Sequence, residues 1–414
     1  MIADYESVDH VSSAYVRPGF SRRKRSPAPK WWGITSVGRA SAWCDPNAVD
    51  HFRLLPLEDL SESDIGRWRE LASRAVEPNP FFEAEYVLPL ARAGGQSSDV
   101  ALATVGSEGG WSACLPVRAV PRWHRLPLPS LSVWRGHPLY SLLGTPLLAA
   151  DALEAGAGAL VAGLTRARGS LFTGLDWLVE GGPVAEALAG AIAGEDARAM
   201  RFESFERAFL GRRPQNTYFE ETLSPKHRRE LRRQRRKLGE ELDEEPEMID
   251  RAGDEAAVAE LVSLESRSRL AVRGSVLASD ELHARFFLEL CRDFAAQGRL
   301  QLLELRAGGR TLAMKCNIRA GAGLFYFKIA YDEEFARFSP GVELEVEAVR
   351  LFHDDTDAQW IDSCADANNA MINRLWPDRR IVLTLVLVKG ARGMLARPAV
   401  AALRAVRNRI LGGD

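Results

Sequence analysis

Two β-hairpins with glycine-containing turns lie far apart in the chain and constrain its fold more than any other feature. The first consists of Asp99–Val105 and Trp111–Arg118, and the second of Leu300–Arg306 and Thr311–Arg319. Hairpins of this kind can match by chance, but a shared offset of 200 residues favours two copies of one unit. The matching positions are Val105 and Leu305, Gly109 and Gly309, and Ala113 and Ala313.

The stretches around the hairpins alternate between helical and extended patterns. Some show apolar residues at helical spacing, and others are short runs rich in β-forming residues. This order predicts an α/β fold. The first segment with a globular pattern is His51–Leu57. The predicted strands are Leu171–Leu178, Met200–Phe209 and Gly323–Ala330, and the predicted helices are Leu60–Val76, Asp151–Arg168, Pro183–Ala193, Ala256–Glu265 and Val342–His353.

The length of 414 residues is sufficient for two domains with separate cores. Residues 1–48 are rich in Ser, Pro and Gly and include a basic patch, Arg22–Arg25, so we expect a disordered arm. We expect a first unit at 49–220, a second unit at 221–400 and a C-terminal tail at 401–414.

The composition excludes several classes of protein. With 54 basic and 56 acidic residues the formal charge is −2, so the whole molecule has no field that would recruit nucleic acid. The chain has no run of 18 apolar residues and no secretory signal pattern, so we expect a soluble, cytoplasmic protein. The five cysteines lack C-x-x-C spacing, which indicates buried thiols and no metal site.

The charge is unevenly distributed along the chain. Lys226–Lys237 carries eight basic residues after a Ser224-Pro225 helix start, and Glu240–Glu247 then carries six acids. The first interpretation is a solvated helix that bridges the two units and is neutralised by these acids. Contact with an anionic membrane surface or polymer is a second interpretation. Nucleic acid is the least favoured partner, because no aromatic residues interleave with the basic ones.

The strand Gly323–Ala330 has a polar and an apolar face if its side chains alternate regularly. Tyr326 and Lys328 then share one face, which either meets a ligand or is partly solvated. The other face consists of Phe325, Phe327 and Ile329.

After this strand, Ser339-Pro340-Gly341 marks the start of a helix. Ser339 suits the N-cap and Pro340 the first helical position, where a missing N–H costs nothing. Gly341 leaves the free N–H groups open to an anion, and Arg337 would add a charge-assisted contact. Local sequence alone favours simple helix capping over an anion site.

Several segments together resemble the GNAT-type acetyltransferases of the CelD/BcsL-like family, which is linked to cellulose or exopolysaccharide biosynthesis and is related to Fem-type aminoacyl transferases. The resemblance runs from about Leu223 to Lys389 and includes SPKHRRELRRQRRKL, GGRTLA, YFKIAYDEEFARFSPG and WIDS. Asn79–Glu83 (NPFFE) resembles the family's N-terminal part. The resemblance implies two tandem GNAT-like units, each with a mixed, mostly antiparallel sheet flanked by helices.

The resemblance also implies an acetyl-CoA or longer acyl-CoA donor held beside the strand and the helix start. Arg337, Ser339 and Gly341 would then lie in the loop that receives the donor phosphates. Tyr331 and Asp332 precede that loop, with Tyr331 expected to bind the donor and Asp332 expected near the acyl or acceptor end as a catalytic candidate.

Asp362, at the end of a predicted apolar strand, is the other catalytic candidate. Burial there would raise its pKa and suit it to orient the acceptor or act as a base, although a strand-end cap or salt-bridge partner is the favoured interpretation. Glu343 would favour the helix N-terminus, and His353 would end that helix. Family members carry a Tyr-Lys pair after this strand, and Ile361–Asn373 lacks it, so no role of that pair transfers to this chain.

Acceptor binding is expected from Tyr326 and Lys328 and from arginines that follow the helix Ala256–Glu265. Arg267, Arg269 and Arg273 would contact an anionic carrier lipid or sugar, unless they are simply solvated. These features predict transfer of an acetyl or longer acyl group to a polysaccharide precursor or similar small acceptor. The alternatives are Fem-like aminoacyl transfer from charged tRNA and an inert scaffold protein in exopolysaccharide assembly.

Overall fold

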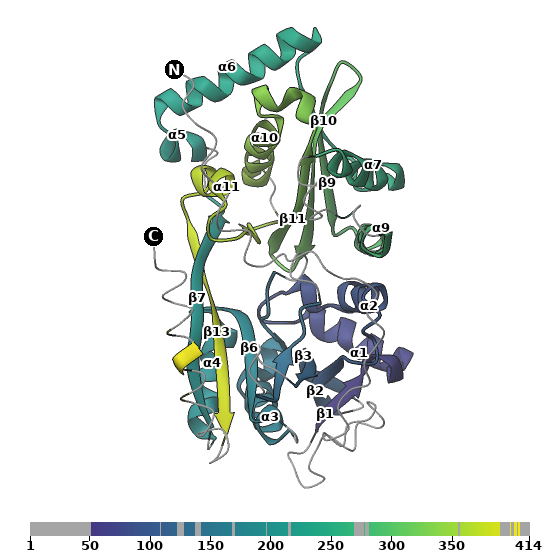
Figure 1. Cartoon of the computed structure of the whole chain (residues 1–414), viewed down its shortest axis with the longest axis vertical. Coiled ribbons are helices and arrows are strands. Elements are labelled where there is room, and N and C mark those ends of the chain that lie inside the picture. The colour runs from purple at the N-terminus through teal and green to yellow at the C-terminus, as the bar shows by residue number, and fades with distance from the viewer. Residues whose placement is uncertain are drawn as a thin grey trace.

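The fold was analysed in a computed structural model of the chain (Figure 1). The structure describes residues 51–389 apart from 108, 122–127, 137–141, 168–169, 196, 214–216, 269–276, 278–280 and 355–356, together with a few residues between 398 and 405. The predicted arm at 1–48, Arg269, Arg273 and most of the tail lie outside the described residues.

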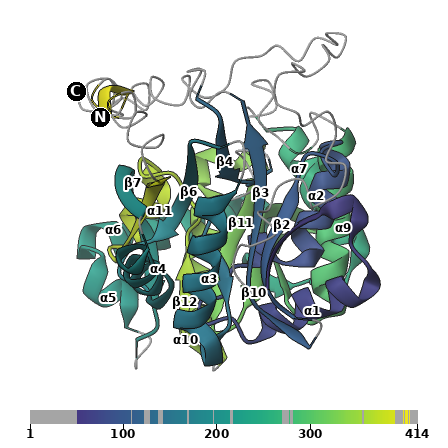
Figure 2. The same cartoon turned by 90° about the horizontal axis from the view of Figure 1, so that it is seen from below.

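The first unit, purple to teal in Figure 1, begins with β1 and ends with β7. Its helices α1 and α2 cover one face of the sheet, and α3 and α4 cover the other (Figure 2). The elements are β1 (Phe52–Pro56), α1 (Glu62–Ser73), α2 (Ala84–Ala93), β2 (Ala101–Ser107), β3 (Gly110–Val120), β4 (Ser130–Val133), β5 (Leu147–Leu148), α3 (Leu153–Arg166), β6 (Phe172–Val179), α4 (Pro183–Gly194) and β7 (Ala197–Gly211), with short 3-10 turns η4 (Leu57–Asp59), η5 (Pro80–Phe82) and η6 (Ala150–Ala152).

The second unit repeats this order in green and yellow, with two extra helices in front of its first strand. Helices α7 and α9 cover one face of its sheet, and α10 packs on the other. The elements are α5 (Tyr218–Thr222), α6 (Pro225–Leu242), β8 (Glu247–Asp250), α7 (Glu255–Ser266), α9 (Glu281–Ala296), β9 (Leu300–Ala307), β10 (Arg310–Ala320), β11 (Gly323–Tyr331), the 3-10 turn η8 (Glu333–Phe338), α10 (Pro340–Asp354), β12 (Trp360–Asp362), α11 (Ala370–Leu375) and β13 (Arg379–Lys389).

Every strand and helix predicted from the sequence is present, with ends within a few residues of the expected ones. Local signals explain this agreement. The Ser61 side chain accepts from the N–H of Asp64, whose carboxylate accepts from the N–H of Ser61, so a capping box starts α1. Ser224 accepts from the N–H of His227 in the same way at the start of α6.

The strands of both units join into one 13-stranded sheet in which the units exchange their last strands. The order is β1-β2-β3-β4-β6-β13-β7-β12-β11-β10-β9-β8, with β5 attached to β3. Strand β13, from the second unit, lies between β6 and β7, while β7, from the first unit, pairs with β12. Figure 1 shows β7 and β13 running side by side along the molecule. The α/β fold of two repeated units is therefore confirmed, and the expected division at residue 220 cuts a continuous sheet.

Each unit contains one pair of parallel strands, and a helix connects the two strands of the pair. In the first unit α3 connects β4 to β6, and in the second unit α10 connects β11 to β12. Such crossovers bring a helix N-terminus to the carboxyl end of a strand. These two crossovers are the places where a ligand site is expected from the fold.

The segment Asn79–Glu83 joins the two units. Phe81 packs edge-to-face on Phe325 of β11, with ring centroids 5.8 Å apart. Glu83 is buried and forms a bidentate ion pair with Arg299 at 2.6 and 2.7 Å. The Asn79 side chain is also buried and accepts from the N–H of Phe81. This motif therefore has a structural role between the units.

The described cysteines and helices agree with a globular protein. Cys114, Cys291, Cys316 and Cys364 are free and buried. Over the part of the chain that the structure describes, no helix combines the length and apolarity needed to cross a bilayer.

Candidate functional site

Among the described residues, the outer half of β11 has no strand partner on the side of the crossover in the second unit. Pairing with β12 begins at Gly323 with Trp360 and ends at Phe325 with Asp362. Strand β11 continues for six more residues to Tyr331, so its outer half diverges from β12. At the usual rise per residue, about 20 Å separates the point of divergence from the end of the strand. We call this region the β11 opening.

A β-bulge in β11 explains both the divergence and an error in the sequence prediction. The register with β10 shifts between Cys316, opposite Lys328, and Asn317, opposite Tyr326, so one extra residue lies on β11. A bulge bends and twists its strand. It also moves Lys328 to the α7 face, where it forms an ion pair with Glu265, while Tyr326 faces α10 and α11. The expectation that Tyr326 and Lys328 share one face is therefore wrong, and Ile329 lies on the Tyr326 face.

The helix that follows the opening starts as predicted, at Pro340. Ser339 adopts a left-handed conformation with φ 56°, instead of the extended one typical of an N-cap. Its carbonyl accepts from the N–H groups of Val342 and Glu343 at 2.9 and 3.1 Å. Since Pro340 has no N–H, this leaves Gly341 to provide the donor of the first turn. The anion site predicted here is therefore smaller than a helix N-terminus with all its donors free.

Gly341 lies directly against the outer end of β11. A Cβ atom at this position would meet the Tyr331 ring at 3.3 Å and the Ile329 side chain at 3.8 Å. The glycine therefore lets α10 approach the strand closely. Tyr331 is 38% exposed, and its ring lies at the rim of the opening. The structure brings together these two predicted donor-binding residues.

The two charged residues predicted around the loop have protein partners. Arg337 is 64% exposed in its side chain and pairs with Glu241 of α6 at 2.7 Å. Asp332 caps η8 by accepting from the N–H of Glu334 at 3.0 Å, and it pairs with Arg310 at 3.3 Å. Asp332 lies at the Tyr331 end of the opening, about 20 Å from the point of divergence.

Helix α6 packs on the second unit and does not bridge the two units. Leu231 and Leu238 are buried in its contacts, and Arg235 binds Glu343 at 2.5 Å and Glu347 at 3.0 Å, both on α10 (Figure 1). Burial raises the pKa of Glu343, and the Arg235 charge opposes this rise. Glu343 thus lies in the first turn of α10 and is paired there with Arg235.

The acidic residues of Glu240–Glu247, which begin in the last turn of α6, neutralise that helix only in part. Arg236 pairs with Glu240 at 3.4 Å, but Glu247 pairs with Arg306 of β9. Lys226, Arg229, Arg232 and Lys237 are exposed. The prediction that these acids neutralise the basic helix is therefore only partly correct.

Asp362 lies where β11 and β12 diverge and is completely buried. One oxygen accepts from Arg207 of β7 at 2.6 Å and from Arg380 of β13 at 2.8 Å, and the other accepts from the N–H of Cys364 at 2.9 Å. Burial alone would raise the pKa of Asp362, but the two guanidinium charges and these hydrogen bonds hold it below its ordinary value. The expectation of a raised pKa is wrong. The sequence did not reveal that Arg207 and Arg380 would both bind this carboxylate. An anion with three donors is a poor proton acceptor.

Arg267 and His353 lie at the C-terminal ends of their helices. Arg267 is exposed at the end of α7. His353 ends α10, where burial and then the charges of Arg212 and Arg213 lower its pKa. Its interpretation as a helix C-terminal residue is consistent with this position.

A buried ion pair beside the divergence point was missed by the sequence analysis. Lys315 of β10 and Glu345 of α10 are both fully buried, with Nζ and Oε2 2.7 Å apart. The Lys315 ammonium lies over the rings of Tyr326, at 4.3 Å, and Trp376, at 5.7 Å. Burial lowers the pKa of Lys315, which Glu345 opposes. A lysine inside an apolar strand and a glutamate on the apolar face of a helix are the sequence signals that could have found this pair.

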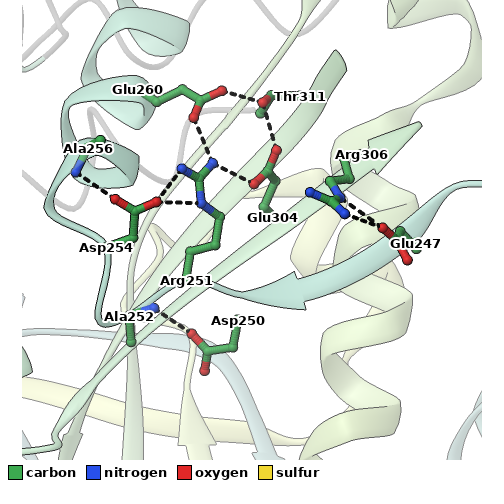
Figure 3. A network of polar contacts seen from close by, with 10 residues as sticks. All are labelled: Glu247, Asp250, Arg251, Ala252, Asp254, Ala256, Glu260, Glu304, Arg306 and Thr311. Atoms are coloured by element: carbon green, nitrogen blue, oxygen red, sulfur yellow. Dashed lines mark hydrogen bonds and ion pairs between the residues drawn. The ribbon is translucent and has the colours of Figure 1, made fainter. Parts of the chain in front are cut away.

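A second network of charges holds α7 onto the outer edge of the sheet (Figure 3). Arg251 donates to Asp254 at 2.5 Å, to Glu260 at 2.7 Å and to Glu304 at 2.7 Å. Thr311 donates to Glu304 at 2.7 Å. Arg251 thus holds three carboxylates together, and the network ties α7 to the sheet.

The crossover of the first unit is filled by its own chain. The N–H of Gly144 donates to Trp177 of β6 at 2.9 Å, and the Thr145 hydroxyl accepts from the N–H of Val179. A Cβ atom on Gly144 would lie 1.7 Å from the Asp176 carbonyl oxygen. The segment 142–148 therefore packs tightly against β6, next to where β4 ends, and we call it the plug.

These features define the class of protein. A repeated α/β unit with a crossover helix beside a diverging parallel strand pair is the arrangement of an acyltransferase fold of the GNAT type. The comparison of sequences agrees for the second unit: residues 225–370 match the family model described as an acetyltransferase (GNAT) domain. No curated protein sequence matches the chain.

Solved structures agree with this fold across both units. FemX matches with a TM-score of 0.53 at 8% identity, over 81% of this chain and 98% of FemX. A conserved protein of unknown function from Bacteroides thetaiotaomicron has a TM-score of 0.50 at 10% identity, over 81% of this chain and all of that protein. A tandem GNAT protein from the clavulanic acid biosynthesis pathway matches more loosely, with a TM-score of 0.37 at 13% identity over 81% and 98% of the two chains.

Proposed function

We propose that the chain is an acyltransferase that uses an acyl-CoA donor held in the β11 opening. The observation that carries this proposal is the unpaired outer half of β11 beside the start of α10, within the matched GNAT domain. An unpaired strand edge offers backbone N–H and C=O groups that can pair with the amides of a pantetheine arm.

The residues of the opening fit such a donor from its phosphate end to its acyl end. The Gly341 N–H and the exposed Arg337 guanidinium would bind phosphate, with Ser339 shaping the turn between them. Tyr331 would cover the arm near the rim. The extended arm would then follow β11 and bring the thioester close to Phe325 and Asp362, about 20 Å away.

In this proposal the acyl group passes directly to the acceptor without a covalent enzyme intermediate. The C–S bond of the thioester breaks as the acceptor nitrogen or oxygen bonds to the acyl carbon, and the proton that the acceptor loses ends on the leaving thiolate, which is released as the CoA thiol. Asp362 acts as a positioning residue because its carboxylate is occupied by Arg207 and Arg380. Asp332, at the other end of the opening, caps η8 and would shape the donor loop.

The acceptor class follows from the sequence resemblance to CelD/BcsL-like proteins. We propose a polysaccharide precursor or similar small molecule, with Lys328 and Arg267 on the α7 side as candidate contacts. A cytoplasmic location would give the enzyme access to acyl-CoA. The exposed basic residues of α6 support a peripheral contact with an anionic membrane or polymer.

Fem-like aminoacyl transfer is the second candidate function, and it is favoured by the match over 98% of FemX. Both candidates use the same opening but differ in the carrier of the acyl group. Transfer from aminoacyl-tRNA, assayed beside acyl-CoA, separates them.

Calorimetric titration with acetyl-CoA and with longer acyl-CoAs tests the donor. We expect binding to the wild type and no measurable binding to Gly341→Glu, because the added carboxylate repels phosphate and collides with Tyr331. Gly158→Glu is the matched control, since this helical glycine in α3 has open space around it. If no acyl-CoA binds, or if Gly341→Glu binds like the wild type, the proposal is wrong.

A further inference from the structure

The side chains around the Lys315–Glu345 pair contain several polar atoms that nothing in the structure satisfies. Within the described part of the chain, four of these atoms have no hydrogen-bond partner although they are buried: Glu345 Oε1, the Tyr326 hydroxyl, the Tyr218 hydroxyl and Trp376 Nε1. Each of these side chains is at least nine-tenths buried. We call these four residues and Lys315 the polar cluster.

The polar cluster is one site because its members surround the same ion pair. Lys315 lies over the rings of Tyr326 and Trp376, whose centroids are 6.5 Å apart. After burial, the Glu345 charge helps raise the pKa of Tyr326, and Tyr218 belongs to the same buried group of side chains as Tyr326 and Trp376. Its members come from α5, β10, β11, α10 and the end of α11.

Such a cluster is unfavourable in a core unless something else compensates it. A buried ion pair rarely repays its desolvation, and each unsatisfied buried polar atom costs additional free energy. Hydrophobic residues of similar shape would give a more stable core, as they do around the cluster. The arrangement therefore indicates that a polar group from outside the protein completes these hydrogen bonds.

The position of the cluster identifies which group this is. Tyr326 follows Phe325, the last residue of β11 that pairs with β12, so it borders the divergence point. In the proposed function, on which this inference rests, the acyl end of the donor lies there. The cluster lies on the α10 side of β11, opposite the face that carries Lys328.

The charge of the cluster narrows the chemistry further. Lys315 and Glu345 neutralise each other, and burial already disfavours the charged form of Lys315. A second ammonium would therefore be disfavoured. Glu345 Oε1 needs a donor, Trp376 Nε1 needs an acceptor, and a hydroxyl group can serve both.

We propose that the polar cluster recognises a hydroxyl group on the acyl chain of the donor, so that the preferred donor is a hydroxyacyl-CoA. Tyr326 is the specificity-determining residue, because it borders both the opening and the ion pair. The side chains are closed to solvent in this structure, so α11, which carries Trp376 at its end, would shift when the acyl group enters.

Calorimetric binding of three donors of similar length tests this proposal: butyryl-CoA, 3-hydroxybutyryl-CoA and 3-aminobutyryl-CoA. We expect 3-hydroxybutyryl-CoA to bind about 5- to 10-fold more tightly than butyryl-CoA, the value of about one net hydrogen bond. In Tyr326→Phe we expect this ratio to fall to about 1. The aminoacyl donor should bind no more tightly than butyryl-CoA.

Tyr86→Phe is the matched control, because Tyr86 is a buried tyrosine packed on the opposite face of β11. It should keep the wild-type ratio. Tyr218→Phe is a second test variant, which should also lower the ratio and keeps the proposal testable if Tyr326→Phe does not fold.

The outcomes separate this inference from the proposed function. Equal binding of butyryl- and 3-hydroxybutyryl-CoA to the wild type overturns the inference and leaves the acyl-CoA proposal intact, as does tighter binding of the aminoacyl donor. A preference that survives both tyrosine variants also overturns it. Absence of binding by all three donors overturns the proposed function itself.

Discussion

The two crossovers of the sheet have the same topology but differ in what lies between their parallel strands. In the first unit, the plug bonds to β6 through Gly144 and Thr145. In the second unit, β11 extends six residues beyond its last pair with β12, and α10 begins after a single 3-10 turn. The comparison supports the proposal that the second crossover, and not the first, holds the donor.

The starts of the two crossover helices, α3 and α10, also differ in their charge and in the space around them. Helix α3 has no side-chain cap at Ala152 and carries Glu154 as its second residue, which disfavours an anion. Helix α10 has Gly341 at its second position, and its nearby Glu343 is bound by Arg235. Charge and space therefore both favour a phosphate at α10.

The largest expected effect comes from separating the two units. We expect neither 49–220 nor 221–414 to unfold cooperatively when expressed alone, because β13 would be missing between β6 and β7, and β12 would lose β7. Co-expression of both pieces should restore a single transition. Circular dichroism during thermal unfolding measures this, and a cooperative transition in either piece alone would contradict the exchanged sheet.

The next effect concerns Asp362, which ties β12 to β7 and β13. Asp362→Ala leaves two buried arginines without their partner and should lower the free energy of unfolding by about 3–5 kcal/mol. Asp332→Ala, at a partly exposed cap, should cost about 1 kcal/mol. Urea unfolding compares the two variants. Equal losses of unfolding free energy would show that the buried contacts of Asp362 with Arg207 and Arg380 contribute no more than the exposed cap.

The same carboxylate predicts how stability depends on pH. Its pKa in the folded state lies below the unfolded value of about 3.9, so its contribution is complete above that value and is lost as the pH falls towards the folded pKa. The difference in stability between the wild type and Asp362→Asn should therefore shrink as the pH is lowered below about 4. A difference that stays constant in acid would contradict the assignment of a lowered pKa.

A substitution in the plug should have a smaller effect on stability, and it tests whether the first crossover takes part in donor binding. Gly144→Ala forces a methyl group against the Asp176 carbonyl and should lower the free energy of unfolding by about 2–3 kcal/mol. It should leave acetyl-CoA affinity unchanged, measured by calorimetry at a temperature where the variant is folded. Gly190→Ala, in open space on α4, is the control. A loss of donor affinity would assign a binding role to the first crossover.

The smallest effect is expected at Arg337, because this side chain is exposed and already forms an ion pair with Glu241. Arg337→Ala should raise the Kd for acetyl-CoA by about 3- to 10-fold, and the effect should weaken as salt is added. Arg350→Ala, on an exposed later turn of α10, should leave the Kd unchanged. Equal effects of the two substitutions would remove the direct phosphate contact.

The sequence predicted the elements of the fold well because their signals are local. Ser61 and Asp64, for example, form a capping box within four residues. The exchange of β7 and β13 was not predictable, since an apolar strand pattern does not specify which neighbour it pairs with. The face of Lys328 was wrong because a bulge changes the alternation without changing the residue types. The pKa direction of Asp362 was wrong because Arg207 lies 155 residues away.

Hydrogen exchange with and without acetyl-CoA tests most directly that the second crossover, and not the first, holds the donor. The account predicts that the donor slows exchange at residues 326–345, across the outer half of β11, η8 and the start of α10. It predicts no change at 142–160, which covers the plug and the start of α3. Protection confined to 142–160 would contradict the account.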